Sequence, residues 1–258
     1  KIKQLKKQLN GNSFLLFITV ALFVAMYVAG MIVFADKGFA KPQMFLNLFI
    51  TDAGLLVTSM GLTIVMISGG IDISVGSVTA LVCMVTAVSM EKYGLNAYTT
   101  IVIALLIGLA YGIVQGFLVS YLEIQPFIVT LAGMFFGRGM TSIVSVDMIS
   151  ITNEVFLKWA KFKIYLPIGS YNKKGVFLPA YIYPTVVIAL LIWIAIMIIM
   201  KFTKFGRSIY AVGGNQQSAL MMGLNVKKIK FQAYILDGIL ASIGGYLVCL
   251  NSCAGFVE

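Results

Sequence analysis

The sequence predicts an all-α, polytopic transmembrane helix bundle. Hydrophobic residues make up 60% of the 258 residues and charged residues only 11%, whereas about 25% of a typical soluble domain is charged. Seven apolar stretches approach the roughly 20 residues that a helix needs to cross the hydrocarbon core. Because backbone groups in lipid must be satisfied within the protein, we expect these stretches to be helices.

The spans follow one another along a single transmembrane domain, residues 1–258. The predicted spans are Phe14–Phe34, Met44–Ser68, Ser74–Met90, Tyr98–Ser120, Pro126–Val144, Tyr181–Met200 and Phe231–Leu250. Lysines and arginines gather beside the span ends at 1–13 and 201–230, which places both segments in the cytoplasm. The loop at 145–179 is then external, and we expect it to form either a structured external cap or a short interfacial helix around Phe156–Tyr165.

The net charge of +10 fits attraction to anionic lipid headgroups, because the charges flank spans and no nucleic-acid-binding motif is present. Partners therefore include membrane lipids and no nucleic acid. The three cysteines lack metal-ligand spacing and are interpreted as packing residues, so no metal site is predicted. Catalytic motifs and a phosphate-binding glycine loop are also absent. If ATP drives this protein, another chain must bind it.

The basic loop at 201–230 is longer than a simple turn between helices. Asn215 is a suitable N-cap, Gln216–Met222 supplies about two helical turns, and Gly223 stands where a left-handed residue closes a helix. This pattern indicates a short helix at the membrane surface on which a partner docks.

A second polar stretch, Ile67–Ser77, interrupts an apolar run with three glycines, three serines and Asp72. It is either a turn in which Asp72 or Ser74 caps the next helix, or a break that lines a solute pathway. The two interpretations agree if the turn lies at the inner mouth of the pathway.

The helix that begins at Pro126 carries Gly133 and Gly137, a small-residue face that lets another helix approach. Arg138 either faces protein or a water-filled cavity, or reaches toward the interface. Carboxylates within spans are functional candidates by default, and they are Asp52, Asp72 and Asp237. Asp52 and Asp237 are each candidates to bind a polar solute or to pair with Arg138.

Three motifs in order, GGIDISVGS (69–77), QPFIVTLAGMFFGRGM (125–140) and FGRSIYAVGGNQQSALMMGLNVKKIK (205–230), carry a family resemblance. From about residue 45 to 250, the chain resembles the permease subunits of ribose-type ABC sugar importers, in the branched-chain amino acid/ribose permease superfamily. The residues of the second and third motifs are most similar to those of galactofuranose importer permeases. Relatives continue with several more helices beyond Glu258, and a small or neutral residue is expected at Asp237.

The resemblance implies a permease that forms the membrane pathway for a monosaccharide, delivered by an extracytoplasmic sugar-binding protein. It implies a second permease subunit, in a homo- or heterodimer, and a separate ABC ATPase that holds ATP and Mg²⁺. This chain would then be no enzyme, would hold no cofactor, and would lie in the bacterial cytoplasmic (inner) membrane. The resemblance places the ATPase coupling residues at Gly206, Arg207, Gly213, Gly214, Asn215, Ala219 and Gly223.

The candidate pathway or substrate residues are polar residues of the spans and of their interruptions, together with one aromatic residue. The polar ones are Asp52, Asp72, Ser74, Arg138 and Asp237, and the aromatic one is Phe127. The alternatives are a nucleoside or other small-solute ABC permease, a secondary carrier that works without an ATPase, and a membrane scaffold with no solute pathway. A scaffold has no need of polar interruptions, and a carrier needs a gradient-coupled carboxylate.

Overall fold

The computed structural model describes residues 11–34, 38–171 and 177–256. Most of the predicted N-terminal cytoplasmic segment, residues 1–10, and Glu258 lie outside the described residues. The chain divides into two compact units, residues 1–46 with 166–180, and residues 47–165 with 181–258.

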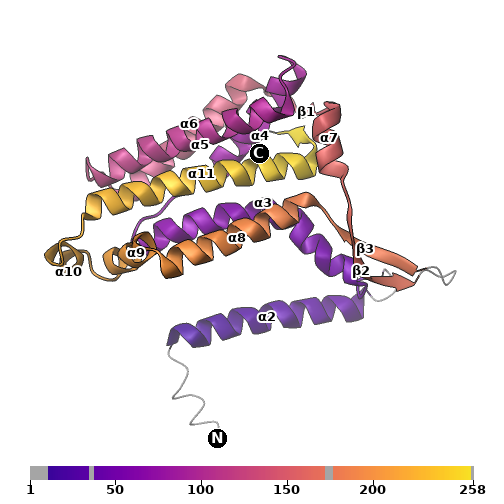
Figure 1. The fold of residues 1–258 in the computed structure, drawn as a ribbon, viewed down its shortest axis with the longest axis horizontal. Helices are drawn as coiled ribbons and strands as arrows, with labels where there is room; N and C mark the ends of the chain where they lie inside the picture. Colours follow the sequence, from indigo (N-terminus) through magenta and orange to yellow (C-terminus); the bar gives the residue numbers. More distant parts are fainter. Residues whose placement is uncertain (1–10, 35–37, 172–176, 257–258) are drawn as a thin grey trace, which may run out of the picture. The chain divides into compact units, whose positions relative to one another are not determined.

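Each of the seven predicted spans is a helix (Figure 1), and six are long and apolar enough to cross a membrane. The seventh, α4, has only 17 residues. The fold class predicted from the sequence, a polytopic helix bundle, is therefore confirmed. The helices are α2 (Gly11–Val33), α3 (Pro42–Ile67), α4 (Val75–Glu91), α5 (Ala97–Ser120), α6 (Pro126–Val144), α8 (Pro184–Phe202) and α11 (Val226–Ser252).

The first unit contains α2, the start of α3 and most of a hairpin made by β2 (Ile164–Tyr171) and β3 (Phe177–Ile182). The Tyr27 ring of α2 packs on Phe39 and Phe45, with ring centroids 5.4 and 5.8 Å apart. The hairpin was not predicted. Pro167 and Gly169 lie within β2, and both residue types weaken a strand pattern in a sequence.

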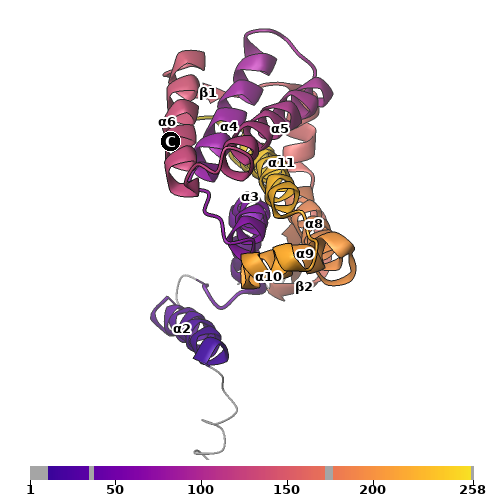
Figure 2. The same cartoon turned by 90° about the vertical axis from the view of Figure 1, so that its left-hand side faces the viewer.

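In the second unit α11 packs between two layers of helices. Helices α4, α5 and α6 lie on one side of it, and α3 and α8 lie on the other (Figure 2). Glycines allow the closest approaches. A Cβ atom at Gly108 of α5 would collide with the carbonyl oxygen of Gly238, and one at Gly54 of α3 would collide with Val248. Such small-residue contacts bring helix backbones together in membranes, where the hydrophobic effect does not drive helices to associate.

The two ends of α11 carry different accessory elements (Figure 1). Its C-terminal end meets α7 (Glu154–Lys161) and the antiparallel pair β1 (Ile149–Ser150) and β4 (Ala254–Gly255). Helix α7 overlaps the interfacial helix predicted around Phe156–Tyr165, and Asn153 caps it. The N-terminal end of α11 meets α10 (Gln216–Met221) and α9 (Lys204–Gly214). Helix α9 was not predicted from the sequence.

Candidate functional site

Helix α10 is closed at both ends as the sequence predicted. The Asn215 Oδ1 accepts a hydrogen bond from the Ser218 backbone N–H at 2.8 Å. At the other end Gly223 has φ +79°, a left-handed conformation that glycine adopts without the penalty of a Cβ atom. The Leu224 N–H then donates to the Ala219 carbonyl at 3.1 Å. These caps give a helix of only six residues a defined place on the surface.

Helix α9 attaches this short helix to the ends of two spans. Thr203 caps α9 by accepting from the Gly206 N–H at 3.2 Å, and Gly206 packs directly on the backbone of Met200. At the far end of α9, Gly213 packs against the Ile67 carbonyl, the last residue of α3. Two predicted coupling residues are therefore points of backbone contact with α8 and α3.

The other predicted coupling residues differ in exposure. Arg207 is exposed and donates from Nη1 to the Phe202 carbonyl at 3.2 Å. Gly214 faces open space. Ala219 is fully buried, so its side chain is not available to a partner, and a charge there would disturb the packing of α10 itself.

The exposed apolar surface of α10 lies beside Ala219. Leu220, Met221 and Met222 expose 54%, 88% and 67% of their surface. Methionine is common at surfaces that bind partners because its flexible thioether adapts to the contact. We call these three residues the α10 apolar tip.

The loop at 121–125 joins the same end of the second unit. The Lys227 Nζ lies 2.7 Å from the Glu123 Oε1, and the Lys230 Nζ donates to the Gln216 Oε1 at 3.0 Å. The hydrogen bond and the charge of Lys227 hold the pKa of the Glu123 carboxyl below its usual value. These contacts tie the start of α11 both to α10 and to the α5–α6 loop.

The predicted break between α3 and α4 contains a buried polar cluster. Asp72 Oδ1 accepts from both the backbone N–H and the hydroxyl of Ser74, each at 2.7 Å. From α5, the Gln115 Nε2 donates to the Ser74 hydroxyl at 2.8 Å, and from α11 the Tyr234 hydroxyl donates to the Ile71 carbonyl at 3.1 Å. The segment is thus a turn buried within the protein, and the Ser74 side chain at the N-cap position of α4 accepts no hydrogen bond from the backbone N–H groups of that helix.

Asp237 meets this cluster from the middle of α11. Its side chain is fully buried and packs against Gly61 of α3, and its carboxyl interacts electrostatically with that of Asp72. Within the part of the chain that the structure describes, neither carboxyl oxygen has a hydrogen-bond partner. Unpartnered carboxyls at this depth are costly, which makes Asp237 the most unusual polar group in the bundle.

The structure does not bring the remaining pathway candidates to this cluster. Asp52 is half-buried on α3, nine residues or roughly 14 Å of helix from Gly61. Phe127 and Arg138 are exposed on α6. Arg138 therefore does not pair with the buried Asp237. The small-residue face of α6 does pack inward, since Cβ atoms at Gly133 and Gly137 would meet Gln115 and Ser77.

Gln115 and Tyr234 were not among the predicted site residues. Gln115 is an amide within the apolar run of α5, and this position was a usable signal, because a buried amide requires hydrogen-bond partners. Tyr234 gave no comparable signal, since a tyrosine in a span is usually a packing residue.

Residues 44–255 match the family described as branched-chain amino acid transport system / permease component. The chain belongs to this permease family. It is 33% identical over 246 residues to the inner membrane ABC transporter permease protein YjfF of Escherichia coli (strain K12). The aligned residues make up 93% of this chain and 69% of that protein.

Two sugar permeases are also similar. The fructose import permease protein FruG of Bifidobacterium longum (strain NCC 2705) is 31% identical over 90% of this chain and 66% of its own length. The ribose import permease protein RbsC of Escherichia coli (strain K12) is 35% identical over 74% of this chain and 56% of its own length. This permease therefore belongs with the ribose-type sugar importer permeases, as its motifs predicted, and spans between about half and two thirds of these relatives. No solved structure matches it significantly.

Proposed function

We propose that this chain is the permease subunit of an ATP-driven importer for a monosaccharide, and that its α9–α10 segment is where an ABC ATPase docks. The observation that carries the proposal is the α10 apolar tip, which is exposed on a capped helix that is attached to the membrane spans. A short helix that served only as a connection would have no reason to present two methionines and a leucine to water.

The attachment supports a mechanical role for this segment. A push on α10 reaches α3 through the Gly213–Ile67 contact and α11 through the Gln216–Lys230 hydrogen bond. Ile67 directly precedes the break that contains Asp72 and Ser74. Closure of two ATP sites would thus act as a rigid-body displacement next to the buried polar cluster, and the ATPase would bias the two states of the pathway by contacting them differently.

The buried polar cluster is the proposed pathway element of this chain. Asp72, Ser74 and Gln115 carry the donors and acceptors that a sugar hydroxyl needs, and Asp237 adds two unpartnered oxygens. A second permease subunit would complete the pathway, and an extracytoplasmic sugar-binding protein would deliver the solute. We place the protein in the bacterial cytoplasmic membrane, with the N-terminus and the α9–α10 end in the cytoplasm, because basic residues gather there.

Two alternatives retain specific support. The cluster would accept a nucleoside or another small polar solute as well as a monosaccharide. The buried Asp237 beside Asp72 favours a gradient-coupled carrier as a further candidate, since intramembrane carboxylates serve proton relays.

Reconstitution tests the proposal. The permease assembly is placed in proteoliposomes with its ATPase and binding protein, and uptake of radiolabelled ribose, fructose, galactofuranose and a nucleoside is measured. We expect uptake of one sugar that requires ATP hydrolysis and the binding protein. Uptake that follows a proton gradient without the ATPase would establish the carrier instead, and saturable uptake of the nucleoside alone would change the solute class.

A further inference from the structure

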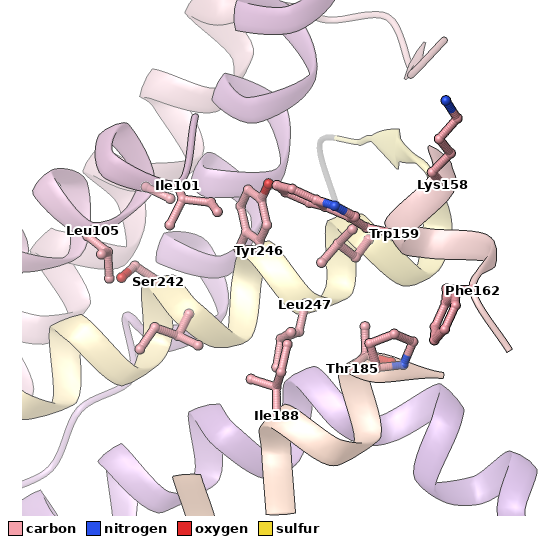
Figure 3. A pocket seen from close by; sticks show the side chains of 14 residues that line it. Ile101, Leu105, Lys158, Trp159, Phe162, Thr185, Ile188, Ser242, Tyr246 and Leu247 are labelled. Carbon is pink, nitrogen blue, oxygen red and sulfur yellow. The ribbon is translucent and has the colours of Figure 1, made fainter. Parts of the chain in front are cut away.

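A cavity of about 600 Å³ lies between α5, α7, α8 and α11 (Figure 3). Its size falls in the range of about 300–1,000 Å³ that is typical of ligand sites. Its wall is aliphatic over most of its depth. The aliphatic residues are Ile101, Leu105, Ile188, Ile243, Leu247 and Leu250. A cavity of this composition excludes water and accepts apolar ligands.

Polar groups at the cavity fall into two kinds. Ser242 and Tyr246 are satisfied by the protein, because their hydroxyls donate to the Ile239 and Ala97 carbonyls at 2.8 and 3.2 Å. Thr185 differs. It lines the cavity, but its hydroxyl oxygen is buried within the protein and has no hydrogen-bond partner among the described residues, so it is not presented to an occupant. None of these hydroxyls therefore offers a free donor, and the wall below the rim acts as an apolar surface.

The rim of the cavity carries a positive charge. Lys158 of α7 lines it with an exposed side chain and forms no ion pair within the described ranges. Next to it, Trp159 packs edge-on against Tyr98 of α5, with centroids 4.9 Å apart. Tryptophan, tyrosine and lysine together mark the depth of the lipid headgroups. The rim is therefore at the membrane interface, and the aliphatic wall is at the depth of the acyl chains.

We propose that this cavity binds an anionic phospholipid. One acyl chain lies between α5, α8 and α11, and the Lys158 ammonium meets the phosphate. The transported solute is a poor fit, because a sugar requires many hydrogen bonds and the wall supplies almost none. The proposal does not depend on the transport function, because it needs only the cavity and the membrane.

Native mass spectrometry of the intact permease assembly tests the proposal, with phosphatidylglycerol and phosphatidylcholine offered in equal amounts. One lysine near an anionic headgroup contributes about 1 kcal/mol, so we expect retention of phosphatidylglycerol over phosphatidylcholine by about fivefold. The Lys158→Gln variant should bring this ratio to about one. The matched variant Lys228→Gln, at the opposite end of α11, should leave it unchanged.

A further variant tests the acyl contact. Ile188→Trp fills the cavity from a partly exposed position and should reduce retention of both lipids. Thermal melting confirms that each variant is folded, and Leu105→Trp replaces Ile188→Trp if that variant is not.

Equal retention of the two lipids by the wild type would overturn the proposal. So would unchanged retention in a folded, cavity-filled variant. If the cavity-filled variant instead dissociates a dimer while lipid retention stays the same, a second copy of this chain occupies the cavity and the lipid assignment is wrong.

Discussion

Gln115 and Ser74, 41 positions apart in the sequence, are joined by a 2.8 Å hydrogen bond from the Gln115 amide to the Ser74 hydroxyl. The same hydroxyl donates to Asp72. The bond therefore connects α5, near its C-terminal end, to the break that precedes α4, and it fixes the Ser74 hydroxyl as an acceptor on one side and a donor on the other. Helix α5 and the break share one buried polar chain.

These linked hydrogen bonds predict the effect of removing the Gln115 amide. Gln115→Leu keeps the bulk but leaves the Ser74 hydroxyl without its donor, so we expect a loss of about 1–2 kcal/mol in the free energy of unfolding. Thermal melting in detergent measures it. Gln115→Glu is the control, because it keeps the size while replacing the donor with an acceptor, and it should destabilise at least as much. An unchanged melting temperature in Gln115→Leu would show that the bond contributes nothing.

Removal of the Asp237 carboxyl should change the free energy of unfolding in the opposite direction. Asp237→Ser removes two unpartnered buried oxygens and relieves the contact with Gly61, while the new hydroxyl can donate to a carbonyl of its own helix. We expect a gain of about 1–3 kcal/mol together with slower uptake, if the carboxyl serves the pathway. Asp52→Ser, half-buried on α3, should change neither quantity much. Lower stability with normal uptake in Asp237→Ser would make Asp237 a structural residue.

The spans and the α10 caps could be predicted because their signals are local. A run of about 20 apolar residues has one physical solution in lipid, and Asn215 and Gly223 fix α10 by their own backbone preferences. The face that α10 presents could not be predicted in this way. Ala219 is buried and Met221 exposed because of how α9 and α11 pack around a helix of six residues, and that depends on distant parts of the chain.

The buried cluster was only partly predictable for a related reason. Asp72, Ser74 and Asp237 are visible as polar residues in apolar runs, but nothing in the sequence says that Asp237 lies near Asp72 while Asp52 lies two to three turns away. That pairing follows from the antiparallel packing of α3 on α11, where Gly61 faces Asp237 and Gly54 faces Val248.

Close packing of α5 on α11 gives a prediction with a matched control. Gly108→Ala places a methyl group against the Gly238 carbonyl, so the helices must separate, at a cost of about 1–3 kcal/mol. Gly139→Ala, in open space on α6, should be neutral or stabilise by up to about 1 kcal/mol. The melting temperatures of the two variants are measured and compared with that of the wild type. Equal effects would contradict the close approach.

The Glu123–Lys227 pair predicts a small effect that depends on pH. Because Lys227 lowers the pKa of Glu123 in the folded state, the pair stabilises the fold above the usual carboxyl pKa of about 4.3. That stabilisation is lost as the pH falls through the lowered value. Glu123→Gln should melt slightly below the wild type at pH 7 in low salt, and the difference should vanish at acidic pH and in high salt. A difference that persists at low pH would mean that charge is not its cause.

Co-purification with the proposed ABC ATPase partner, in mild detergent, tests the central proposal most directly. Met221→Glu places a charge on the α10 apolar tip, and Met148→Glu is the matched control, a methionine of 66% exposure beside β1, at the opposite end of the second unit. We predict that the wild type and Met148→Glu retain the ATPase and that Met221→Glu loses it while remaining folded. Full retention by Met221→Glu, or no retention by the wild type, would contradict the assignment of α10 as the docking helix.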